Sequence, residues 1–206
     1  MNPPDWLPAT LAAHALETRI AKGESLFRTS DAVARFHFVA AGELAAIRAM
    51  PNGAEAVMLT ARAGEFFAEA SLFLPRYTCD ARAVSACRII AWPSETFRSA
   101  IFAEPAAALA FSRMLAVNLR RQCSRVERLR MKNADDRILH YLACETAPSG
   151  WVELASSLQE WAAELGLEPE TLYRALSRLE AAGTLERDRR RLRLVGSQVA
   201  SCARPE

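Results

Sequence analysis

The sequence predicts an α+β protein with a β-rich N-terminal part, one long helix and a smaller, mainly helical C-terminal part. Short apolar segments separated by glycines fill residues 22–93, an arginine-rich helical pattern runs from 105 to 131, and two amphipathic patterns flank Gly166. Strands at intervals of about 8–12 residues are typical of sandwiches and barrels, whereas recurrence every three or four residues is typical of helices. We therefore expect three parts, at residues 1–104, 105–132 and 133–206.

The composition, 51% hydrophobic and 24% charged with a net charge of +2, is that of an ordinary globular protein. No apolar run approaches the roughly 18 residues of a membrane span, and the N-terminus has no basic segment typical of a signal peptide. We therefore expect a cytoplasmic protein with no membrane partner. The five cysteines are odd in number and contain no CxxC pair, so we expect reduced side chains; they are Cys79, Cys87, Cys123, Cys144 and Cys202.

In the β-rich part, apolar segments bounded by turn residues predict the strands. Pro51-Asn52-Gly53 predicts a tight hairpin turn, because Asn and Gly accept a positive φ. The expected strands are Phe36–Val39, Leu44–Met50, Ala56–Leu59, Ala81–Ala86 and Arg88–Trp92.

A short helix over Glu95–Phe102, capped by Ser94, and a long helix from Pro105 to Met131 follow. The long helix would extend about 40 Å, more than one small β-domain can cover. A homodimer seam is therefore its expected use, and a helix buried in its own subunit is the alternative. Its apolar stripe is Leu109, Met114, Leu115, Leu119, Cys123, Val126 and Leu129.

The C-terminal part predicts a helix over Arg137–Cys144, begun by Asn133 or Asp135, and then a helix-turn-helix. Gly166 suits the sharp turn, because it has no Cβ, and Pro169 suits the first turn of the second helix. The first helix would bury Leu158, Trp161, Ala162 and Leu165, and the second Leu172, Ala175, Leu176 and Leu179.

The outward side chains of the second helix can reach base edges and phosphates in a DNA major groove. They are Glu170, Thr171, Tyr173, Arg174 and Arg178. Two short strands, Leu185–Arg187 and Leu192–Val195, follow around an arginine-rich turn and predict a wing. The arginine cluster here is consistent with either phosphate contact or a solvated face. Its members are Arg187, Arg189, Arg190, Arg191 and Arg193.

Several segments together make the chain resemble the family of the cyclic-AMP receptor protein and the fumarate-nitrate reduction regulator (CRP/FNR), over about residues 20–195. The matching stretches are Lys22-Gly23-Glu24-Ser25-Leu26-Phe27, Phe38-Val39-Ala40-Ala41-Gly42-Glu43-Leu44, residues 64–73, Asp136-Arg137-Ile138-Leu139 and Glu170-Thr171-Leu172-Tyr173-Arg174. The resemblance implies a cyclic-nucleotide-binding-type β-roll at 1–104, a dimerisation helix at 105–132 and a winged helix-turn-helix at 133–206.

The family resemblance also implies partners and base-reading residues. The partners are palindromic double-stranded DNA, a second copy of the chain, RNA polymerase and a small-molecule effector. Glu170 would accept a hydrogen bond from a cytosine amino group and Arg174 would donate to guanine. Tyr173 stands where many relatives have a small residue, and Glu168 stands where Ser or Thr usually caps the helix.

The sequence leaves the identity of the effector open. The family's phosphate cassette has Gly-Glu and, further on, Arg followed by Ser or Thr, whereas this chain has Ala68-Glu69 and Tyr77-Thr78. Cyclic nucleotide is therefore disfavoured, because a buried phosphate would lack its arginine. The candidate effector-binding residues are Glu69, Arg76, Thr78, Arg82, Gln122 and Cys123.

Other cofactors and functions have little sequence support. An iron–sulfur cluster needs an N-terminal cysteine cluster, and the first cysteine is Cys79. Haem with an axial ligand from His14, His37 or Cys79 and a thiol switch at Cys123 remain alternatives, as does an unknown ligand or none. No catalytic or metal-binding arrangement is found, so we do not expect an enzyme; a cyclic-nucleotide module that does not bind DNA is a further rival.

Overall fold

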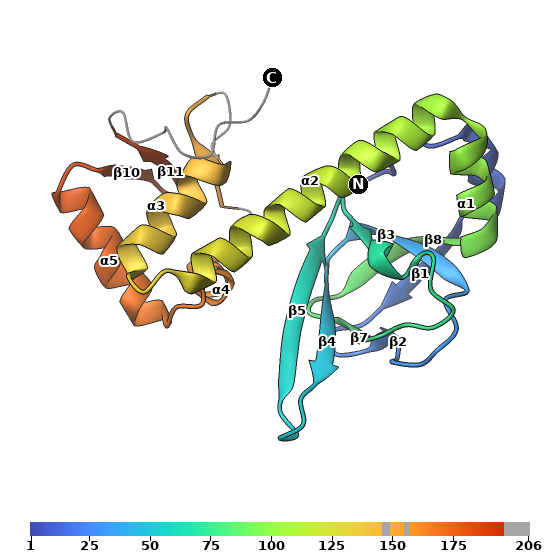
Figure 1. Cartoon of the computed structure of the whole chain (residues 1–206), viewed down its shortest axis with the longest axis horizontal. Coiled ribbons are helices and arrows are strands. Elements are labelled where there is room, and N and C mark those ends of the chain that lie inside the picture. Colours follow the sequence, from blue (N-terminus) through green and yellow to red (C-terminus); the bar gives the residue numbers. More distant parts are fainter. Residues whose placement is uncertain (146–148, 155–156, 196–206) are drawn as a thin grey trace. The chain divides into compact units, whose positions relative to one another are not determined.

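The computed structural model describes residues 1–145, 149–154 and 157–195 (Figure 1). The chain forms two compact units, Met1–Leu115 and Ala116–Glu206. Helix α2 (Pro105–Arg130) begins in the first unit and ends in the second. The division at 104 and 132 that the sequence suggests stays a prediction.

The first unit is a β-roll of two four-stranded sheets with short helices at its ends. One sheet has the order β1-β8-β3-β6 and the other β2-β7-β4-β5. The elements are η1 (Ala9–His14), β1 (Leu16–Ile20), β2 (Ser25–Phe27), β3 (Arg35–Ala41), β4 (Glu43–Ala49), β5 (Glu55–Arg62), β6 (Phe66–Phe67), η2 (Glu69–Ser71), β7 (Asp80–Ala83), β8 (Cys87–Pro93) and α1 (Ser94–Ala103).

Two apolar clusters hold the first unit together. The first cluster lies between the two sheets and includes Phe27, Phe67 and Tyr77. The second cluster packs the start of α2, through Ala107 and Phe111, against α1 and β3. Burial of such aromatic side chains stabilises a fold by about 2–3 kcal/mol each.

The expected strands all form, as β3, β4, β5, β7 and β8, and the hairpin turn lies between β4 and β5 with Gly53 at φ +81°. Strands β1, β2 and β6 are short or exposed and are not predicted by the apolar pattern.

The prediction that Ser94 caps α1 is wrong. Because β8 runs directly into the helix at Pro93, Ser94 is already helical, and its buried hydroxyl makes no hydrogen bond.

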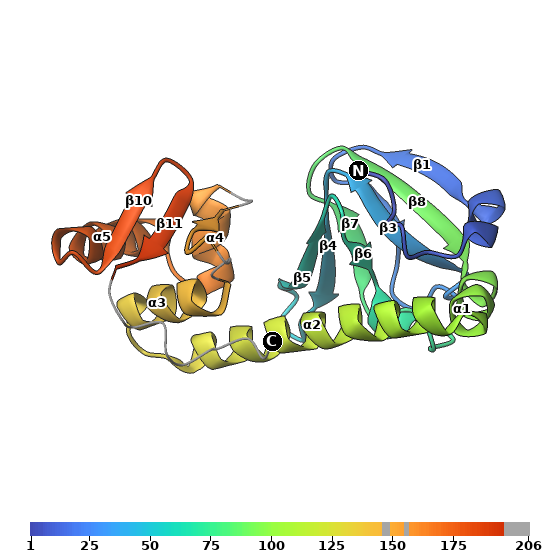
Figure 2. The same ribbon diagram turned by 90° about the horizontal axis from the view of Figure 1, so that it is seen from above.

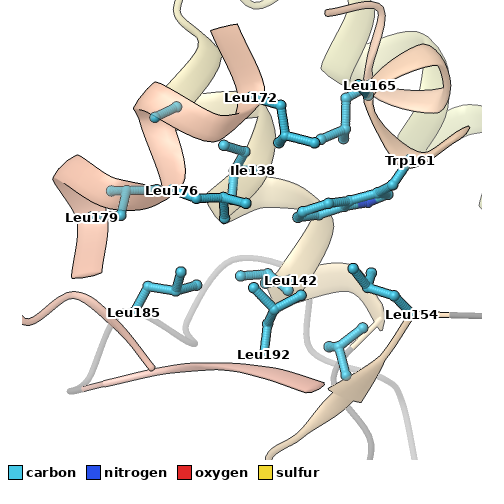
Figure 3. Close-up of a cluster of buried hydrophobic side chains, with 13 residues drawn as sticks. Ile138, Leu142, Leu154, Trp161, Leu165, Leu172, Leu176, Leu179, Leu185 and Leu192 are labelled. Atoms are coloured by element: carbon cyan, nitrogen blue, oxygen red, sulfur yellow. The ribbon is translucent and has the colours of Figure 1, made fainter. Parts of the chain in front are cut away.

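The second unit contains α3 (Ala134–Glu145), β9 (Val152–Glu153), α4 (Leu158–Leu165), α5 (Pro169–Ala181), β10 (Leu185–Asp188) and β11 (Arg191–Leu194). Its sheet has the order β10-β11-β9, and the unpredicted β9 has only two residues. Figure 3 shows how Trp161 of α4 and the leucines of α5 converge on Ile138 and Leu142 of α3. This cluster contains every apolar residue that the sequence assigns to the two helix cores, with Leu158 half-buried.

No single helix among the described residues is long and apolar enough to cross a membrane. Helices α1 and α2 reach that threshold only when taken together across a bend of 114°.

Candidate nucleic-acid interface

The turn between α4 and α5 is built from a capped helix start and a left-handed helix end. The Ser157 hydroxyl accepts from the Glu160 main-chain N–H, and the Glu160 carboxylate accepts from the Ser157 N–H, which forms a capping box. Helix α4 ends at Gly166, at φ +65°. A Cβ there would lie 2.8 Å from Leu129 Cδ2, so both conformation and space require glycine.

Helix α5 begins without a side-chain cap. Glu168 occupies the cap position, but its carboxylate makes no capping hydrogen bond; its charge still favours the positive end of the helix. Pro169 stands in the first turn, where no N–H is needed. Four side chains then face the core, namely Leu172, Ala175, Leu176 and Leu179.

The opposite face of α5 carries all five predicted DNA-contacting residues, and each is exposed: Glu170, Thr171, Tyr173, Arg174 and Arg178. Glu170 and Arg174 form an ion pair one helical turn apart. Arg178 instead donates to Asp135 Oδ1 at 2.7 Å. The structure therefore brings Glu170 and Arg174 together, whereas it ties Arg178 to the first turn of α3.

Arg137 is a positioning residue that the sequence pattern does not reveal. Its Nη1 donates to the main-chain carbonyls of Leu165 (3.0 Å) and Gly166 (2.8 Å), and its Nε donates to the Met131 carbonyl (2.8 Å). One side chain thus satisfies carbonyls at the end of α4 and in the segment before α3. Its only sequence signal is its place in the stretch that resembles the CRP/FNR family.

The wing is the β10–β11 hairpin, drawn in red in Figure 2. Arg187 pairs with Glu180 (3.2 Å), Arg191 with Asp188 (2.5 Å) and Arg193 with Glu186 (2.6 Å). The guanidinium groups of Arg191 and Arg193 also lie over the Trp151 ring. Arg189 and Arg190 form the exposed tip between the strands, with Arg189 at φ +55°.

The apolar stripe of α2 divides into two sets. Met114 and Leu115 pack against the core of the first unit. The exposed set includes Leu109, Leu119 and Val126. Together with Ser112, Ala116 and Cys123, these positions alternate three and four residues apart, which is the spacing of a coiled-coil seam.

Two family models match the chain: the cyclic nucleotide-binding domain over residues 17–104 and the Crp-like helix-turn-helix domain over residues 136–196. The chain belongs to the CRP/FNR family of transcription regulators. The family assignment agrees with the fold of the chain, which has a β-rich N-terminal domain, a long helix and a C-terminal helix-turn-helix.

Solved structures of CRP/FNR regulators are similar over most of the chain. FixK2 from Bradyrhizobium japonicum is 22% identical, with a TM-score of 0.64 over 88% of this chain and 93% of its own. A putative cAMP-binding regulatory protein from Silicibacter pomeroyi DSS-3 is 28% identical, with a TM-score of 0.57 over 95% of this chain and 89% of its own. The c-di-GMP responsive global regulator CLP of Xanthomonas campestris is 23% identical, with a TM-score of 0.54 over 90% of this chain and 96% of its own. No curated protein sequence matches the chain.

The six candidate effector-binding residues have different surroundings, and their role as a site stays a prediction. Arg82 donates two hydrogen bonds to the Glu55 carboxylate, both at 2.7 Å, and Arg76 Nη1 donates to the Ser30 carbonyl at 2.7 Å. Thr78 is exposed, and Glu69 lies in η2. The remaining two, Gln122 and Cys123, are exposed on the part of α2 that belongs to the second unit.

The alternative cofactor ligands differ in exposure and protonation chemistry. His14 is exposed, whereas His37 is buried, and its Nε2 lies 3.2 Å from the Tyr77 hydroxyl. Burial raises the pKa of the Cys79 and Cys87 thiols, which makes them poor nucleophiles. Among the described residues, no group of three or more His, Cys, Asp or Glu side chains is placed to hold a metal ion. Cys202 lies outside the described residues.

Proposed function

We propose that this CRP/FNR regulator binds palindromic double-stranded DNA as a homodimer and reads its sequence through α5. The observation that carries the proposal is the two-sided character of this helix. Its inner face is buried against α3 and α4, while Glu170, Thr171, Tyr173 and Arg174 are all exposed near its N-terminal end. A recognition helix places these same positions against base edges in the major groove.

Glu170 and Arg174 have the chemistry for a cytosine–guanine step. A carboxylate accepts from the cytosine amino group, and a guanidinium donates to the O6 and N7 atoms of guanine. In the free protein the two side chains neutralise each other. On DNA each exchanges this exposed partner, which contributes little, for a base edge of complementary charge.

The wing and the first turn of α3 position the recognition helix in this proposal. Arg189 and Arg190 at the hairpin tip are placed to contact phosphates, which adds affinity without sequence preference. The ion pair between Arg178 and Asp135 fixes α5 on α3. Arg178 is therefore assigned to orientation of the helix, with phosphate contact as its second role.

Dimerisation through α2 gives the operator its symmetry. The exposed seam at positions 109, 112, 116, 119, 123 and 126 has an apolar or small side chain at every position. A two-fold dimer carries two recognition helices, so the expected operator is a palindrome with half-sites about 10 bp apart, centre to centre.

The regulator would act in the cytoplasm, with RNA polymerase as the partner that converts DNA binding into control of transcription. The regulatory input is assigned to the first unit, under an effector that is not identified. The names of two relatives refer to cAMP and c-di-GMP. Arg82 and Arg76, the candidate cations for a nucleotide phosphate, are bonded to Glu55 and to the Ser30 carbonyl, so neither nucleotide is assigned as the effector.

Selection from a pool of random duplexes tests the proposal. The full chain should enrich a palindrome, and sedimentation of the mixture should show two chains on each duplex. Recovery of no common sequence, or of a single half-site bound by one chain, would contradict it. An Arg174→Ala variant passed through the same selection is the matched control and should lose the guanine preference.

A further inference from the structure

The interior of the β-roll contains a ring stack centred on Tyr77. The Tyr77 ring lies parallel to the Phe27 ring, with 3.5 Å between centroids and 7° between planes. The Phe27 ring also lies against the rings of Phe67 and His37, with centroid distances of 5.9 and 5.7 Å. Tyr77 is only 4% exposed. Its side chain is thus part of the core that joins the two sheets.

Hydrogen bonds hold Tyr77 at its hydroxyl group and at its main chain. The Tyr77 hydroxyl donates to the Arg35 carbonyl at 2.8 Å and lies 3.2 Å from His37 Nε2. Because the only hydroxyl proton goes to Arg35, His37 Nε2 must be the donor in the second bond. The Tyr77 main chain also pairs with the loop before β3, through Asp31 and Ser30 at 2.9 Å each.

The two arginines that the sequence offers for a buried phosphate, Arg76 and Arg82, are engaged elsewhere. Arg82 is held by Glu55, and Arg76 is exposed and bonded to the Ser30 carbonyl. A nucleotide placed between the sheets would displace the Tyr77 ring from its stack on Phe27 and break the hydrogen bond from Tyr77 to the Arg35 carbonyl. Its phosphate would also be buried without either of these two arginines to balance its charge.

We propose that Tyr77 is a built-in occupant of the β-roll interior, which excludes cyclic nucleotides from the first unit. The tyrosine stands at the sequence position where the family carries the phosphate-binding arginine, and it replaces the ligand with a side chain. Regulation of this chain is then independent of cAMP and cGMP. The inference concerns the β-roll alone and does not depend on DNA binding.

Thermal unfolding of the full chain tests the exclusion directly. A ligand that binds only the native state raises Tm, and the rise grows with the ratio of its concentration to its Kd. The Tm of the wild-type protein should not change with millimolar cAMP or cGMP. A concentration-dependent rise in Tm with either nucleotide would overturn the proposal.

A cavity variant tests the positive half of the proposal, that Tyr77 fills the interior. Tyr77→Ala should unfold at a lower temperature, and p-cresol, which reproduces the missing side chain, should raise its Tm but not that of the wild type. Phe73→Ala, which removes a ring 59% exposed in the same segment, is the control and should not respond. An equal p-cresol response in Phe73→Ala, or none in a folded Tyr77→Ala, would overturn it.

Tyr77→Phe covers the case in which the alanine variant does not fold. It keeps the ring stack and removes only the hydroxyl. Its Tm should fall slightly and stay insensitive to both nucleotides, whereas a nucleotide-dependent rise would contradict occupation by the ring.

Discussion

The Arg137 guanidinium donates a 2.8 Å hydrogen bond to the main-chain carbonyl of Gly166, the residue that ends the first helix of the helix-turn-helix. The same side chain also donates to the Met131 carbonyl, just before α3. A cation at the end of a helix stabilises its exposed carbonyls and opposes the negative end of its dipole. The orientation of the turn before the recognition helix therefore depends on one arginine.

Substitution of Arg137 by methionine should loosen this turn, because it keeps the apolar stem and removes every donor. We expect a loss of about 2 kcal/mol in the free energy of unfolding, measured by urea titration followed by circular dichroism. Arg113→Met, at an exposed arginine of α2, is the control and should change stability little. Equal stabilities of the two variants would show that the Arg137 hydrogen bonds do not support the turn.

His37 makes the stability of the first unit depend on pH. Burial, together with the positive charge of Arg35, lowers its pKa from 6.5 to about 4. The unfolded chain therefore takes up the proton first as the pH falls. The contribution of a neutral His37 is complete above pH 6.5 and is lost between 6.5 and about 4, to a limit of about 3 kcal/mol.

The comparison with His37→Phe isolates this contribution. Both proteins lose stability in acid as carboxylates titrate, but the difference between their unfolding free energies should change across this pH range. Urea titrations at pH 7 and pH 5 measure it. A constant difference would mean that His37 takes up its proton without cost in the folded protein.

Substitutions of Leu119 test the proposed dimer seam on α2. This side chain is 66% exposed in a single chain, so a change there should disturb contacts between chains and not the core. Leu119→Asp places a charge in the proposed interface and should shift the sedimentation coefficient to that of a monomer. Leu119→Met keeps an apolar side chain and should remain dimeric. A dimeric Leu119→Asp protein would place the interface on another surface.

A substitution of Arg189 can test phosphate contact without disturbing the fold, because this residue is exposed at the tip of the wing, at φ +55°. Arg189→Gly removes the charge and relieves the unfavourable backbone conformation, so the protein should be equally or more stable by up to about 1 kcal/mol. Its DNA affinity should fall on every sequence alike, with the slope of log K against log salt reduced by about 1 per chain. An unchanged slope would remove Arg189 from the interface.

The sequence predicts the helix-turn-helix well because its signals are local. The buried leucines of α5 recur at helical spacing, and Gly166 and Pro169 mark the turn and the start of the helix. The five outward side chains then follow from the inner face. The Arg137 hydrogen bonds to Leu165 and Gly166 could not be predicted, because they join residues distant in the sequence and only the fold determines their partners.

The β-roll illustrates the same limit. The sequence shows that Tyr77 stands in place of an arginine, but it does not show where the Tyr77 side chain points. The side chain points into the core because Phe27, from a strand too short to be predicted, provides a stacking surface. Similarly, Ser94 is a good cap by residue type, but β8 runs into the helix without the intervening turn that a cap requires.

The most direct test of the account is the affinity of wild-type and Arg174→Ala proteins for the selected palindrome and for a scrambled duplex, measured by fluorescence anisotropy at one salt concentration. The Arg174→Ala protein should lose about 1–3 kcal/mol of binding free energy on the palindrome and little on the scrambled duplex. Arg189→Gly, as the control for phosphate contact, should lose equally on both. Full discrimination between the two duplexes by Arg174→Ala would contradict the assignment of α5 as the helix that reads the sequence.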